Sequence, residues 1–278
     1  MSMNAAILQR SSLRKYGAVF SQGIQSAMEY RADFLFGLFN GCFSVFIQFF
    51  LWTAIYSGSQ ENNLYGYSYP QMVVYVIMAG IMLRIVSIDF HYDIAFDIKQ
   101  GTLNRFLTQP ISYFPYRVFD FIGRKIFQLG FIIVISAGVL IFTHFVFSAE
   151  FTLSNILFAV LVLPLSLFLN CMLFYCISMT AFWMTEAWGV FDGMGVVSTI
   201  LSGGLFPLSV FGETAQEIFK YMPFQYVIYF PLRIICGNAQ KEDIVFGICA
   251  QLIWILLLYI LAKLLWRAGM KKYIAAGG

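Results

Sequence analysis

Residues 156–182 read ILFAVLVLPLSLFLNCMLFYCISMTAF, and this stretch decides the fold class. It is uncharged and almost wholly apolar, and about 20 such residues cross a hydrocarbon core of roughly 30 Å as a helix. Similar stretches recur along the 278-residue chain, which is 60% hydrophobic and only 11% charged. Since no soluble segment of domain size lies between them, we predict an all-α membrane protein with one membrane domain over residues 1–278.

Six apolar stretches are predicted to cross the membrane. They cover residues 34–56, 72–90, 121–145, 156–182, 188–205 and 244–265. Pro164 lies inside the fourth and predicts a kink, which neighbouring helices can accommodate. Ahead of the first, residues 13–31 repeat apolar side chains four positions apart among charged ones, which predicts an amphipathic helix at the membrane surface.

Basic residues orient these spans. Lys and Arg occur before the first span, in the loop 91–117 and after the sixth span, whereas residues 57–69 and 148–155 contain none. Because Lys and Arg accumulate on the cytoplasmic side of membrane proteins, both termini and the loop 91–117 are expected to be cytoplasmic. Residues 202–243 then lie on the outer side.

The outer region 202–243 is too apolar for an aqueous loop. Glycines and Pro207 interrupt the fifth span there, and Pro223 ends a short amphipathic helix. Irregular backbone at membrane depth is tolerated only where protein buries it or a cavity wets it. We therefore predict a re-entrant helical hairpin between spans five and six.

The tetrapeptide LSGG at residues 201–204 resembles the start of a signature found in ABC ATPases, but this chain is not predicted to be one. Such ATPases need a G-x-x-x-x-G-K-[ST] loop to hold phosphates, and the sequence has none. His91 is expected on the cytoplasmic side and His144 at the opposite end of the third span, so they cannot share a catalytic site. The five cysteines show no metal-ligand spacing. We expect no catalytic residues, no metal and no cofactor on this chain.

The order of these features resembles the permease subunits of ABC type-2 exporters, and most closely bacterial permeases related to antibiotic-resistance exporters. Residues 97–112, DIKQGTLNRFLTQPIS, are similar to a G-x-L…L…P loop of that family. The matching positions are Gly101, Leu103, Leu107 and Pro110. Residues 204–224 are similar to its outer segment, through Gly204, Pro207, Leu208, Pro223 and Phe224.

This resemblance implies that this chain forms the membrane path and that separate subunits hydrolyse ATP. Two separate ABC ATPase subunits would bind ATP and Mg and dock on the cytoplasmic loop of a bacterial inner (plasma) membrane permease. The expected coupling residues are Gly101, Leu103, Arg105, Phe106, Leu107 and Pro110, with the apolar ones exposed to fill a partner groove; a helix lying on lipid is the alternative. The expected outer gate consists of Gly203, Gly204, Pro207, Pro223 and Phe224.

The remaining implications concern assembly and cargo. A second copy or a related permease would complete the path, with spans two and five at the interface and membrane lipid, but no nucleic acid, as the other partner. The substrate would be amphipathic or hydrophobic: a drug, antibiotic, peptide or lipid. An ion- or proton-coupled secondary transporter is the alternative, although the sequence shows no repeated halves.

Charges inside or beside the spans are candidate functional residues. Arg84 lies within span two and must snorkel, pair with Asp89 or face a water-filled cavity. Glu186 and Asp192 flank the turn into span five and could form a proton or cation site.

Acidic residues repeat every four positions after span two, at Asp89, Asp93 and Asp97. This stripe could pair with Arg14, Lys15 or Arg124, or face solvent. Asp120 lies between Arg117 and Arg124 at helical spacing, which predicts a local ion-pair cluster at the start of span three.

Overall fold

The computed structural model describes residues 2–109, 111–147, 152–184 and 186–273, without the side chains of residues 2–13, 107 and 147. Within these residues five helical segments are long and apolar enough to cross a membrane. They are Arg31–Gly58, Tyr69–Lys99, Tyr113–Val146, Leu153–Phe182 and Lys241–Met270. They contain α2 (Arg31–Gly58), α3 (Tyr69–Val86), α6 (Tyr113–Phe147), α7 (Leu153–Ser178) and α11 (Lys241–Met270). The chain is therefore a multi-pass helical membrane protein, as predicted.

The predicted fifth span coincides with a short helix, α8 (Trp188–Leu201). Its 14 residues extend about 21 Å at the α-helical rise, which is less than the roughly 30 Å of a hydrocarbon core. The helix ends where Gly203 adopts a φ of +78°. A crossing at residues 188–205 thus stays a prediction, whereas the other five spans have matching helices.

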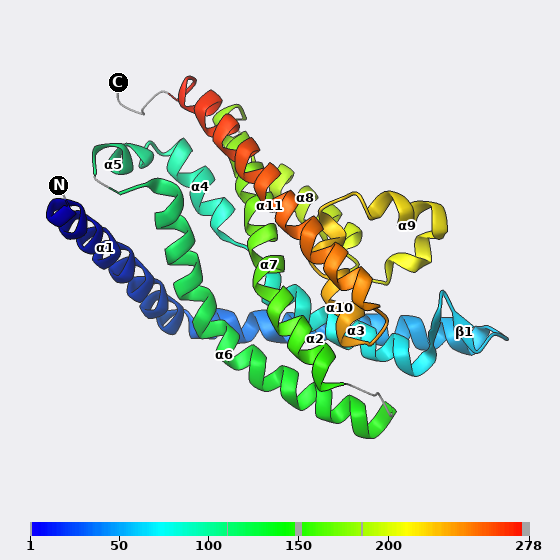
Figure 1. Ribbon diagram of the computed structural model, residues 1–278. Helices are drawn as coiled ribbons and strands as arrows, with labels where there is room; N and C mark the ends of the chain where they lie inside the picture. Colours follow the sequence, from blue (N-terminus) through cyan, green and yellow to red (C-terminus); the bar gives the residue numbers. More distant parts are fainter. Residues whose placement is uncertain (1, 110, 148–151, 185, 274–278) are drawn as a thin grey trace.

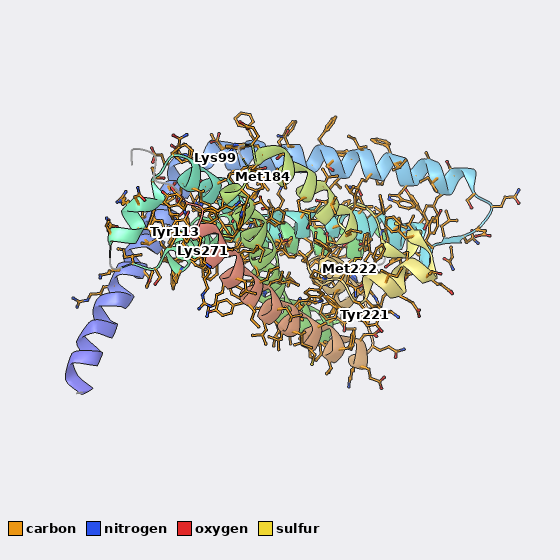
Figure 2. All side chains as sticks on the ribbon, turned by 90° about the horizontal axis from the view of Figure 1, so that it is seen from above. Lys99, Tyr113, Met184, Tyr221, Met222 and Lys271 are labelled. Carbon is orange, nitrogen blue, oxygen red and sulfur yellow. The ribbon has the colours of Figure 1, made fainter. Side chains whose placement is uncertain are left out.

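The helices form a bundle with two distinct ends (Figure 1). The start of α1 (Ser2–Glu29), the end of α11, and the short helices α4 (Phe90–Lys99) and α5 (Leu103–Thr108) gather at one end, hereafter the α5 end. The short elements between α8 and α11 lie towards the other, the α9 end. They are η2 (Leu208–Phe211), α9 (Glu213–Phe219), η3 (Phe224–Tyr226) and α10 (Tyr229–Ile235). Figure 2 shows the same separation, with Lys99, Tyr113 and Lys271 far from Tyr221.

Helix α3 lies in the core, whereas α2 faces outward. Met72, Tyr75 and Met82 of α3 are fully buried or nearly so, while α2 exposes a row of phenylalanines that includes Phe39 and Phe43. A connection with the antiparallel strands β1 (Asn63–Leu64) and β2 (Tyr67–Ser68) joins the two helices. Span two therefore leaves little free surface to line an interface between permease copies.

Helix α1 packs against α6 through glycine contacts. Within residues 14–29, whose side chains the structure describes, the buried positions of α1 are Val19, Gly23 and Ala27, four residues apart. A Cβ on Gly23 would lie 2.4 Å from the Asp120 carbonyl oxygen, and the Cα atom of Gly123 is 3.2 Å from the same position. The amphipathic helix predicted over 13–31 is therefore longer than expected and docks on protein through small residues.

The chain between α8 and α11 folds back on itself. The backbone N–H of Tyr229 donates to the Ser202 carbonyl oxygen at 2.8 Å, and the Tyr75 hydroxyl donates to the Gly203 carbonyl oxygen at 2.6 Å. A Cβ on Gly204 would lie 2.9 Å from Leu83. These contacts fix the turn that begins the predicted hairpin.

A buried polar cluster anchors the part of this segment that returns towards α11. Gln251 of α11 donates to Ser166 of α7 and to the Tyr226 carbonyl oxygen, each at 2.9 Å. Ser166 also donates to that carbonyl at 3.1 Å. Gln251 and Ser166 are fully buried, so the cluster ties η3 to two membrane helices.

Replacing Gln251 with leucine is expected to lower the free energy of unfolding by about 1 kcal/mol, the usual net value of a hydrogen bond. Unfolding in mixed micelles, followed by circular dichroism, measures this change. The exposed Gln60→Leu is the matched control and should leave stability unchanged. Equal stability of both variants would show that the cluster contributes nothing.

Candidate functional site

The connection between α4 and α6 is organised around one buried carboxylate, Asp97. Its oxygens accept hydrogen bonds from the Thr102 hydroxyl at 2.7 Å and the Tyr113 hydroxyl at 2.6 Å, and they pair with Arg117. Asp97 is only 6% exposed. Since buried charges are stable only when paired and hydrogen-bonded, these contacts join α4, the turn before α5, and α6 into one unit.

Arg124 forms a second ion-paired cluster, which extends this unit towards the bundle. Arg124 Nη2 lies 3.0 Å from Asp93 and 3.1 Å from Asp120, and Nη1 lies 3.6 Å from Asp89. Arg117 also reaches Asp93, at 3.4 Å. Of the alternatives left open for the acidic stripe, Asp89 and Asp93 take the pairing with Arg124, whereas Asp97 pairs with Arg117, which was not among the suggested partners. The predicted pair between Asp120 and Arg124 is confirmed.

Helix α5 turns its apolar side inward. Leu103 is fully buried, so the expectation that it is exposed for a partner was wrong: its side chain packs into the bundle's own core. Phe106 is half-buried, with its ring centroid 5.0 Å from that of Tyr113 and 4.7 Å from that of Tyr116.

The surface that remains exposed differs from the predicted one. Arg105 is exposed on α5, and Gly101 makes the turn before it with a φ of +73°. Phe96 of α4, which the sequence did not single out, is 54% exposed. The Leu107 side chain and Pro110 lie outside the described residues. The described parts of α4 and α5 therefore present an exposed apolar side chain, Phe96, and an exposed cation, Arg105, on an ion-paired support.

Arg84 has a different partner from the one suggested. Its guanidinium donates to the Gly37 carbonyl oxygen of α2, whereas Asp89 pairs with Arg124. Asp89 follows the end of α3, where the helix has stopped, so the two side chains no longer share a helical face. A Cβ on Gly41 would lie 3.0 Å from Arg84 Nε, so the small residues of α2 make room for this cation.

The two acidic residues near α8, Asp192 and Glu186, have different surroundings. Asp192 accepts a hydrogen bond from the Tyr92 hydroxyl at 2.5 Å, which links α8 to α4. Glu186 is exposed. Among the described residues no group of three or more His, Cys, Asp or Glu side chains could hold a metal ion.

The proposed gate residues lie within the protein rather than on its surface. Gly203, Gly204, Pro207 and Pro223 are buried, and Phe224 is half-buried. Burial raises the pKa of the nearby Cys236 thiol to about 12, so this cysteine stays protonated at neutral pH. The segment is a packed structural element in this state.

Together the fold and the α5 end define a class: a multi-pass helical membrane protein with a rigid, ion-paired connecting element at one end. The family follows from comparison with known proteins. A family model described as "ABC-2 family transporter protein" matches residues 43–277, and the chain belongs to this family. No curated protein matches the chain significantly. ABC-2 permeases are membrane components without an ATPase site of their own and associate with an ABC ATPase, which agrees with dismissing LSGG as an ATPase signature.

Proposed function

We propose that this chain is the permease subunit of an ATP-driven exporter in the inner membrane of a bacterium. Two ATPase subunits dock at the α5 end, which is cytoplasmic together with both termini. A second permease, identical or related, completes the path, and α8 with part of the following segment provides the sixth crossing. The cargo is an amphipathic or hydrophobic molecule, such as a drug, antibiotic, peptide or lipid.

The observation that carries this proposal is the ion-paired connection from α4 to α6. Helix α3 and helix α6 lie on either side of it, so movement of a docked partner at α4 and α5 is passed to two membrane helices. Asp97, Arg117 and Arg124 prevent this connection from deforming locally, because each is held by more than one contact. A rigid connection of this kind would convert the movement of a docked partner into a displacement of the attached helices.

Docking is expected to depend on Phe96. Changing Phe96 to aspartate places a charge on the exposed apolar surface of α4 and should reduce co-purification of an ABC ATPase by at least about tenfold, as for an interface anchor worth roughly 2 kcal/mol. Affinity purification from native membranes with quantitative mass spectrometry measures this ratio.

The control is Tyr221→Asp, which adds the same charge to a side chain that is 78% exposed at the α9 end. It should leave ATPase recovery unchanged. Leu103→Asp is unsuitable, since it would place a charge in the core and unfold the element. Unchanged recovery with Phe96→Asp would remove α4 from the docking surface, and the absence of any ATPase partner of the wild-type chain would overturn the proposed function.

The folded-back segment is proposed to gate the exit of cargo at the α9 end. Two features support this proposal: the closed backbone turn at Gly203 and the half-buried aromatic rings that follow it. A segment packed in this way can open as one piece. Deleting residues 212–224 should abolish regulated export, measured as ATP-dependent efflux from vesicles. Normal efflux after the deletion would argue against a gate.

A further inference from the structure

Two cavities meet at the Arg84 side chain. One is polar, about 410 Å³ in volume, and lies between the end of α1, the start of α2, and α6. The other is an almost wholly apolar groove of about 360 Å³ between α2, α3 and α6, lined by residues that include Cys42, Val45, Ile81 and Ile135. Arg84 and Ile132 line both, so the polar and the apolar space adjoin at these two side chains.

The polar cavity contains cations without matching carboxylates. The hydrogen bond described for the Arg84 guanidinium goes to a carbonyl oxygen, and a guanidinium has more N–H donors than this bond uses. Lys125 is 2% exposed, and its Nζ donates to the Arg84 and Ser87 carbonyl oxygens at 2.7 and 3.0 Å and to the Ser87 hydroxyl at 2.9 Å. These described contacts are all to neutral oxygens.

The other charged groups facing this cavity do not cancel these two cations. Arg124 is satisfied by Asp89, Asp93 and Asp120, and among the described residues only one further carboxylate, Asp33, lines the cavity. The cavity lining carries the cations Arg84, Arg124 and Lys125 and the carboxylates Asp33 and Asp89. Asp89 acts on Arg124 and Lys125, whereas no ion pair between Arg84 and a carboxylate is described, so the remaining positive charge lies at Arg84. Because an unpaired cation beside hydrocarbon is costly, the site favours an anion with an apolar extension.

We propose that this site binds one anionic phospholipid from the membrane leaflet at the α5 end. The phosphate lies at Arg84, near Lys125, and one acyl chain runs along the groove between α2 and α6. Basic pockets between membrane helices bind anionic headgroups through this combination of charge and apolar surface. The inference does not depend on ATP-driven export, since it concerns the permease chain alone.

Native mass spectrometry of the purified full-length chain tests this site by titration with phosphatidylglycerol and phosphatidylcholine of equal acyl length. We expect phosphatidylglycerol to bind about tenfold more tightly, as one to two cationic contacts provide. Arg84→Gln should remove this preference, whereas Lys271→Gln, which removes the same charge from an exposed position at the α5 end, should retain it. Arg84→Lys keeps the charge and should keep part of the preference.

A second variant tests the groove separately from the charge. Cys42 is exposed in the groove, so Cys42→Trp fills the space without displacing the core and should weaken both lipids. Equal binding of the two lipids by the wild-type chain would overturn the proposal, as would an unchanged preference in a folded Arg84→Gln variant. Displacement of the lipid by excess inorganic phosphate would identify a free-anion site and would also overturn it. If Arg84→Gln does not fold, Arg84→Lys and Cys42→Trp provide the test. Lipid binding that Cys42→Trp leaves unchanged would exclude the groove as the place of the acyl chain.

Discussion

An Asp97→Ala variant is expected to lose about 3 kcal/mol of stability, because removing one partner of a buried ion pair leaves an uncompensated charge. Arg117 would be left without its closest carboxylate, and the Thr102 and Tyr113 hydroxyls would lose their acceptor. Asp97→Asn keeps the shape and the acceptor but removes the charge, so it should be less destabilising. Thermal or denaturant unfolding in detergent measures both variants.

The matched control for Asp97 is a carboxylate in an exposed ion pair. Asp243 lies 3.2 Å from Arg233, and its side chain is 47% exposed. Exposed pairs contribute about 0–1 kcal/mol, and Asp243 also accepts a hydrogen bond from the Gln240 backbone N–H at the start of α11. Asp243→Ala should therefore cost about 1 kcal/mol, clearly less than Asp97→Ala. A similar small effect at both positions would mean that the α4–α6 connection is not rigid, which would also weaken the proposed coupling through it.

The membrane fold could be predicted largely from the sequence because apolar length is a local property. Five of the six predicted spans have matching helical segments, whose ends differ from the predicted ones by up to nine residues. The exception, residues 188–205, combines an apolar composition with a helix that stops early. Gly203 turns there because Tyr75 and Tyr229 pack beside it, and those contacts come from distant parts of the chain.

The site was predicted less well because helical spacing does not reveal which face of a short helix is buried. The apolar residues of α5 read equally well as a docking surface or as core, and tertiary packing buries Leu103. Phe96 was missed for the same reason, since it lies among residues that face inward. By contrast, the acidic stripe could be recognised as a candidate ion-pairing face because its charges repeat at helical spacing, although spacing alone left several cations and solvent open as partners and did not identify Arg117 as the partner of Asp97.

Glycine contacts between helices were also missed, since glycine carries no side-chain signal in a single sequence. At the crossing of α1 and α6, a Cβ on Gly123 would lie 2.3 Å from the Phe20 carbonyl oxygen. Backbone atoms cannot rotate away as a side chain does, so the two helices must separate to accommodate any larger residue. Close helix approach through small residues is a common device in membranes.

A Gly123→Leu variant is therefore expected to detach α1 from α6. Tyr16, whose ring stacks on Phe119 at 5.3 Å and whose hydroxyl oxygen accepts a hydrogen bond from the Ser112 backbone N–H, would lose both contacts. Spin labels on α1 and α6, measured by pulsed electron paramagnetic resonance, should report a longer and broader distance distribution. If α1 transmits force at the α5 end, ATP-dependent efflux should fall with it.

Gly130→Leu is the control for this variant, since it makes the same change on the same helix at a position where a Cβ would meet nothing within 4 Å. It should leave both the spin-label distances and efflux unchanged. If α1 detaches and efflux stays normal, the helix has a structural role and does not take part in transport. Unchanged distances in Gly123→Leu would contradict the close crossing itself, because no rotamer of leucine avoids the carbonyl oxygen that its Cβ already meets.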